Sequence, residues 1–134
     1  MRRILLPVDG SRSSASALEY LLERKKRGER ARIDVLFVQP APLVMNKEVA
    51  NILLEEQLKV FSDRRIAAGM KKLHVKPIFI IGDPALSIIK YAVSENVDEI
   101  VMGTRGRGRI AQVLLGSVAA KVIQLAAVPV TLVK

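Results

Sequence analysis

The residues best suited to chemistry lie in one segment near the carboxyl end, VMGTRGRGRIAQVLLGSV at residues 101–118. It combines glycines at positions 103, 106, 108 and 116 with arginines at positions 105, 107 and 109. Because glycine has no Cβ atom, its backbone can bend so that successive N–H groups face an anion. Three interpretations stand at this point: a loop that binds phosphates, a basic element for nucleic acid, or a surface loop without a ligand.

Two common nucleotide-binding loops are excluded by the spacing within this segment. No Gly-Lys-Ser/Thr follows the glycines, so the phosphate-binding lysine of P-loop NTPases is missing. Gly106 and Gly108 also lack the third glycine of the dinucleotide-binding fingerprint. Gly116 and Ser117 instead precede a helical pattern, and the unpaired N–H groups at a helix start favour an anion. Ser117 therefore either bonds a phosphate or only caps that helix.

The elements that would position this segment alternate along the chain. Mainly apolar segments typical of strands lie at residues 4–8, 33–38, 75–81, 97–102 and 128–133. Pro77 predicts that the third strand is an edge strand. Patterns with helical spacing lie between them, at residues 15–28, 50–61, 84–96 and 118–127. This order predicts an α/β fold: a single-domain, open, parallel five-stranded sheet with helices on both faces. Ligands of such sheets bind beyond the carboxyl ends of the strands, where the glycine segment begins.

Length and composition narrow the class of protein. The 134 residues suit one domain, residues 1–134, and no apolar run approaches the roughly 20 residues of a membrane helix, so we expect no membrane partner. The chain has no cysteine, which excludes disulfides and thiolate metal sites and fits a cytoplasmic protein. The net charge of +9 attracts polyanions, but charge alone does not distinguish RNA, a membrane surface and ATP.

Four landmarks together resemble the ATP-binding subgroup of the universal stress protein family. Gly103, Gly106 and Gly116-Ser117 have the spacing G-x2-G-x9-G-(S/T). The opening ILLPVDGS, the turn Gly82-Asp83-Pro84 and the closing VPVTLV follow in the order of the family. The resemblance covers essentially the whole chain. It implies a Rossmann-like fold of the adenine-nucleotide alpha-hydrolase type with sheet order 3-2-1-4-5, in which Asp9 and Gly103 face each other across one crevice.

The resemblance also implies a binding site for ATP. Asp9 would accept hydrogen bonds from the nucleoside, while the glycines, Ser117 and the N–H of Val118 would hold the phosphates. Mg²⁺ would be held through the phosphates, because no metal-ligating protein side chains are expected. The arginines would pair with phosphate or stay solvated, and Gly82 would approach the adenosine or serve only in its turn. The full set of expected nucleotide-binding residues is Pro7, Val8, Asp9, Val38, Gly82, Met102, Gly103, Arg105, Gly106, Arg107, Gly116, Ser117 and Val118.

The residues favour binding of ATP over its hydrolysis. Hydrolysis usually needs a carboxylate that holds Mg²⁺ beside the phosphates, but Asp98 and Glu99 lie at the opposite end of the fourth predicted strand. The only histidine, His74, precedes the third strand and is expected at the surface, so no Ser-His-Asp set is available. We therefore expect a stress-response regulator whose bound nucleotide sets the state that an unknown protein partner recognises, with slow or no hydrolysis.

The remaining residues bear on two other functions, nucleic-acid binding and protein interaction without a nucleotide, and on the assembly of the chain. Basic clusters at residues 24–27, 64–65 and 71–72 could serve a nucleic-acid-binding module, but 4% aromatic residues disfavour a stacking platform. A nucleotide-free interaction domain is disfavoured by the intact glycine spacing. The last predicted strand is too apolar for an open edge. In the family this edge pairs with its copy, so the resemblance implies a homodimer through Val130 and Leu132.

Overall fold

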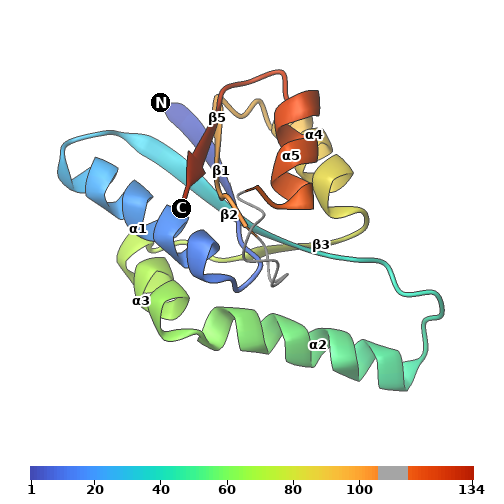
Figure 1. Ribbon diagram of the computed structural model, residues 1–134. Helices are drawn as coiled ribbons and strands as arrows, with labels where there is room; N and C mark the ends of the chain where they lie inside the picture. The colour runs from blue at the N-terminus through green and yellow to red at the C-terminus, as the bar shows by residue number, and fades with distance from the viewer. Residues whose placement is uncertain (106–114) are drawn as a thin grey trace.

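Five parallel strands form the sheet of the computed structural model, which describes residues 1–105 and 115–134 (Figure 1). They are β1 (Arg2–Pro7), β2 (Ala31–Gln39), β3 (Ile78–Ile81), β4 (Glu99–Gly103) and β5 (Val130–Val133). Their order is β3-β2-β1-β4-β5, which confirms the predicted order and the edge position of β3. The order reverses between β1 and β4, so the crevice of this sheet type lies there.

Helices cover both faces of the sheet. They are α1 (Arg12–Lys26), α2 (Lys47–Ser62), α3 (Arg64–Leu73), α4 (Pro84–Ser94) and α5 (Ser117–Leu125). Leu18 of α1 and Ile66 of α3 belong to one buried cluster, whereas Ile88 of α4 and Val122 of α5 belong to another on the opposite face. In Figure 1, α2 runs below the sheet, across the end at which the strands finish. None of the described helices is both long and apolar enough to cross a membrane.

All five strand starts differ from the predicted ones: β1 and β2 begin earlier than predicted, and the other three strands begin later. β3 begins after Pro77 and β5 after Pro129, because proline has no N–H to donate to the sheet. β4 begins at Glu99 rather than at residue 97. The helix α3 was not predicted. It starts because the carboxylate of Asp63 accepts the N–H groups of Arg65 and Ile66, both at 3.1 Å.

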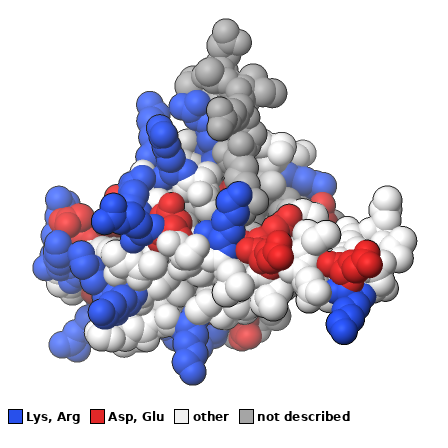
Figure 2. Space-filling model, turned by 90° about the horizontal axis from the view of Figure 1, so that it is seen from below, with Lys and Arg blue, Asp and Glu red and all other residues white. Residues whose placement is uncertain are grey.

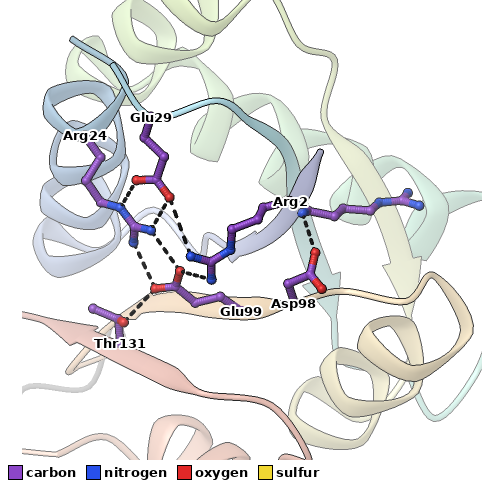
Figure 3. A network of polar contacts seen from close by, with 7 residues as sticks. Arg2, Arg24, Glu29, Asp98, Glu99 and Thr131 are labelled. Carbon is purple, nitrogen blue, oxygen red and sulfur yellow. Dashed lines mark hydrogen bonds and ion pairs between the residues drawn. The ribbon is translucent and has the colours of Figure 1, made fainter. Parts of the chain in front are cut away.

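The amino end of the sheet holds a group of charged side chains that we call the Glu99 network: Arg2, Arg24, Glu29, Glu99 and Thr131 (Figure 3). Glu99 is 5% exposed, and both of its carboxylate oxygens accept hydrogen bonds from Arg24 at 2.9 Å. Thr131 of β5 donates to the same carboxylate at 2.7 Å, and Arg2 of β1 at 3.2 Å. Arg24 also binds Glu29 at 2.6 Å. The network therefore joins α1, β1, β4 and β5.

A second buried carboxylate lies on the other face of the same end. Asp34 of β2 accepts hydrogen bonds from Arg3 and from the hydroxyl of Tyr91, both at 2.8 Å. Burial, followed by the hydrogen bond to Asp34, raises the pKa of Tyr91 to about 12. Both buried acids of the strands are thus paired with arginine far from the glycine segment.

Candidate functional site

A cavity of about 590 Å³ opens at the carboxyl ends of β1, β2 and β4. Figure 2 shows the molecule from this end. Lys and Arg side chains are spread over the visible face, and Asp and Glu side chains form smaller groups among them. The cavity lies where the strand order reverses. Ten of the predicted nucleotide-binding residues line it: Pro7, Val8, Asp9, Val38, Met102, Gly103, Arg105, Gly116, Ser117 and Val118.

The start of α5 forms one wall of the cavity. Its N-cap residue is Gly116, which has no side chain, so the first-turn N–H groups of this helix receive no side-chain hydrogen bond. Ser117 is the first helical residue, and the interpretation of Ser117 as the cap was therefore wrong. The N–H of Gly116 itself donates to the carbonyl of Thr104 at 2.5 Å. The donors that α5 offers to an anion are thus those that follow Gly116.

The start of α1 forms a second wall. Ser11 is its N-cap, and its hydroxyl oxygen accepts the N–H of Ser14 at 3.2 Å. The carboxylate of Asp9, at the end of β1, accepts the N–H of Ser11 at 2.9 Å and is held beside the helix start. Ser11 and Ser14 both line the cavity, and neither was among the predicted nucleotide-binding residues. Two helix starts and Arg105 therefore bring positive charge to this part of the cavity, next to the negative carboxylate of Asp9.

Ser13 ties the loop after β4 to α1. Its hydroxyl donates to the carbonyl of Arg105 and accepts the N–H of Arg105 at 3.2 Å. A Cβ atom on Gly103 would lie 2.6 Å from the carbonyl carbon of Ser13, closer than real Cβ atoms approach. Gly103 therefore has a structural reason to be glycine besides any approach of a ligand. This contact spans 92 positions of the chain, and no sequence pattern indicated it.

The part of the cavity contributed by β2 and α4 is mainly apolar. Leu36 and Val38 of β2, Ile88 of α4 and Met102 of β4 line it, together with Pro40. One acidic side chain of α2, Glu56, lies among them and was not predicted. The cavity thus combines a positive part with an apolar part, which suits a ligand that has phosphate groups at one end and a ring at the other.

Three of the predicted nucleotide-binding residues are not among those found to line the cavity. Gly82 is not among the described residues that line the cavity; its N–H donates to the carbonyl of Gln39 at 2.9 Å in the turn before α4. Gly106 and Arg107 lie outside the described residues. His74 is exposed at the end of α3, as predicted. Within residues 1–105 and 115–134, no group of three or more His, Cys, Asp or Glu side chains is placed to hold a metal ion.

Comparison with known proteins agrees with this architecture. The sequence profile of the universal stress protein family matches residues 1–134. The chain belongs to this family. Universal stress protein YxiE of Bacillus subtilis (strain 168) is 30% identical over an alignment of 146 positions, gaps included. The alignment covers 98% of this chain and 98% of YxiE. Family membership confirms the resemblance that the four sequence landmarks indicated.

Solved structures of family members have the same fold. The structure of MJ0577, a universal stress protein of Methanocaldococcus jannaschii, has a TM-score of 0.74 and 29% identity, covering 99% of this chain and 95% of that chain. A universal stress protein family protein from Arabidopsis thaliana, solved with AMP bound, has a TM-score of 0.70 and 20% identity. That match covers 100% of this chain and 92% of the Arabidopsis chain.

Proposed function

We propose that the chain binds ATP in this cavity and acts as a nucleotide-dependent regulator in the cytoplasm, with slow or no hydrolysis. The observation that carries the proposal is the pairing of two helix starts, α1 and α5, at one cavity of about 590 Å³. Helix starts present unpaired N–H groups and positive potential, which favour phosphate. The AMP bound to the Arabidopsis family member supports an adenine nucleotide as the ligand.

The polarity of the cavity suggests how ATP would lie in it. The phosphates would face Gly116, Ser117 and Arg105, whose backbone and side-chain donors lie at the positive part. The ribose would lie near Asp9, and the base between Val38 and Met102. Any Mg²⁺ would be held through the phosphates, because the described acidic side chains form no metal-binding group there.

Two acids of β4 and its start lie too far from the cavity to serve catalysis, which favours binding over hydrolysis. Glu99 is paired with Arg24, Arg2 and Thr131 at the amino end of β4, and Asp98 accepts the N–H of Arg3 there. Neither carboxylate can therefore position water or Mg²⁺ beside phosphates at the carboxyl end. In this proposal the bound nucleotide alters a surface that a protein partner recognises.

Calorimetric titration of the nucleotide-free protein with ATP tests the proposal. We expect Gly116→Val to abolish binding, because a branched side chain would obstruct the start of α5. Asp9→Ala should abolish or strongly weaken it, because it removes the acceptor at the end of β1. Asp63→Ala is the matched control, since Asp63 also accepts an N–H two residues ahead but lies outside the cavity lining. A wild-type protein that binds no ATP would contradict the proposal.

We further propose a homodimer through the open edge of β5. The carbonyl of Pro129 accepts from Ile100 of β4, and that of Val133 from Thr104 just after β4. Alternation therefore directs the backbone groups of Val130 and Leu132 to the open edge. The side chains of these two residues pack against the core beside α4 and α5, so pairing would use mainly the backbone.

Two substitutions at Leu132 distinguish pairing through the backbone from pairing through the side chain. Leu132→Pro removes an outward N–H without removing a hydrogen bond to β4, and we expect light scattering to show monomers. Leu132→Ala shortens the side chain but retains the N–H, and should remain a dimer. If both variants remain dimers, the interface lies elsewhere on the molecule.

A further inference from the structure

A group of polar side chains fastens α2 to the end of β2 beside the cavity. Gln39 is 1% exposed, and its side-chain amide donates to the carbonyl of Leu53 at 3.0 Å and to the carboxylate of Glu56 at 3.1 Å. The side-chain oxygen of Gln39 accepts from Gln57 at 3.0 Å. Every hydrogen-bonding group of this buried side chain is therefore used, which fixes where the Glu56 carboxylate lies.

Glu56 has an unused acceptor at the cavity. Gln39 bonds only one of the two carboxylate oxygens, Oε2. Among the described residues, no hydrogen bond or ion pair engages Oε1. Glu56 is half-buried and lines the cavity together with Val38 and Pro40. A carboxylate beside apolar walls gains free energy from any donor that a ligand brings to it.

The order of the strands assigns Glu56 to one end of the bound ligand. The start of α5 follows β4, Asp9 ends β1, and Glu56 is fastened to the end of β2. Neighbouring strands lie about 4.8 Å apart, so β4 and β2 are separated by about 10 Å, with Asp9 between them. A carboxylate repels phosphate, and Glu56 lies at the end away from the phosphate-binding part. It therefore faces the part of the ligand farthest from the phosphates, which is the base.

We propose that Glu56 determines which base the cavity accepts, by receiving a hydrogen bond from an exocyclic amino group of the nucleotide. An ionised carboxylate can only accept hydrogen bonds, so it favours the amino group of adenine and disfavours the carbonyl oxygen that hypoxanthine has at the same position. Recognition of this kind rejects the analogue because the polar group of the site is then left unpaired. The inference rests on the proposed nucleotide binding and adds the residue that selects the base.

Titration with ATP, ITP and 2′-deoxy-ATP tests this role. We expect the wild-type protein to bind ATP at least about tenfold more tightly than ITP, the range of one hydrogen bond to a charged group. Glu56→Ala should bring the two within about threefold. Glu56→Gln retains the length of the side chain and its bond with Gln39, and its amide can also donate to the carbonyl of ITP, so the preference should again be reduced. Glu55→Gln, an exposed neighbour with the same charge change, should keep the wild-type preference.

The outcomes separate this inference from the proposed function. If wild type binds no nucleotide, both are overturned. If wild type binds ATP and ITP equally, or if Glu56→Ala keeps the preference for ATP over ITP, nucleotide binding stands and the role of Glu56 is overturned. If Glu56→Ala removes a preference for ATP over 2′-deoxy-ATP instead, Glu56 contacts the ribose and the inference is wrong. Circular dichroism of each variant checks that α2 remains folded.

Discussion

Replacing Glu99 by alanine is expected to lower the free energy of unfolding by about 3 kcal/mol, the range for removing one partner of a buried ion pair. The change leaves the Arg24 guanidinium without its two 2.9 Å hydrogen bonds to Glu99 and leaves the Thr131 hydroxyl without its acceptor. Arg24 keeps Glu29, which limits the loss to the lower end of that range. Urea denaturation followed by circular dichroism measures the change.

The Glu99 carboxylate should also make the free energy of unfolding depend on pH. Hydrogen bonds from Arg24 hold the pKa of Glu99 below its ordinary value, so Glu99 stabilises the folded state above the unfolded-state pKa. This contribution is lost as the pH falls below about 4 and through the lower pKa of the folded state. Glu99→Gln should therefore show a smaller loss of stability on acidification than wild type does.

An exposed ion pair provides the control for Glu99. Glu19 pairs with Arg65, and the two side chains are 47% and 42% exposed. Glu19→Ala should change the free energy of unfolding by no more than about 1 kcal/mol, because solvent screens such pairs. Equal effects of Glu19→Ala and Glu99→Ala would show that burial of the Glu99 network contributes nothing.

Replacing Gly103 by alanine is expected to destabilise the fold by about 1–3 kcal/mol, the usual range for overpacking a closely packed contact. The added Cβ would meet the backbone of Ser13, which cannot move aside as a flexible side chain can. The start of α1 would have to shift away from β4, and the hydrogen bonds between Ser13 and Arg105 would be disturbed. Thermal denaturation and ATP titration of the same variant should both show a loss.

Ser13→Ala separates the steric contribution from the hydrogen bonds. It removes the hydroxyl that bonds Arg105 but adds no atom near Gly103, so we expect a loss of about 1 kcal/mol and an intact fold. A Gly103→Ala variant as stable as wild type would be incompatible with the contact between β4 and the start of α1.

Most strands and helices could be predicted from apolar runs and from the turn residues between them. Strands buried on both faces are largely apolar, as residues 4–8 are, and such runs need no tertiary information to be found. The helix α3 was missed although Ile66, Met70 and Leu73 have helical spacing. Four basic residues surround them, and these were interpreted as clusters that could bind nucleic acid rather than as part of a helix. Asp63 is a preferred helix-start residue, so together with that spacing it could have indicated α3.

The candidate site was predictable where spacing determines it, and not where packing does. The glycine spacing indicated Gly103 and Gly116, and the family resemblance implied Asp9; all three line the cavity. Ser13 and Glu56 depend on how α1 and α2 lie against distant segments, which the local pattern does not encode. The serines at the start of α1 could have been found, because the turn after the first strand borders the same crevice.

The two ends of β4 have different roles: the amino end contributes to stability and the carboxyl end borders the cavity. At the amino end, the Glu99 network joins four elements through charged groups, and substitutions there endanger the whole fold. At the carboxyl end, the cavity also has half-buried side chains such as Glu56, whose one hydrogen bond to the described residues is with Gln39. Ligand preference can therefore be altered at one end of the sheet while the other end keeps the scaffold intact. A variant of this chain can therefore change the molecules that it recognises without first gaining extra stability.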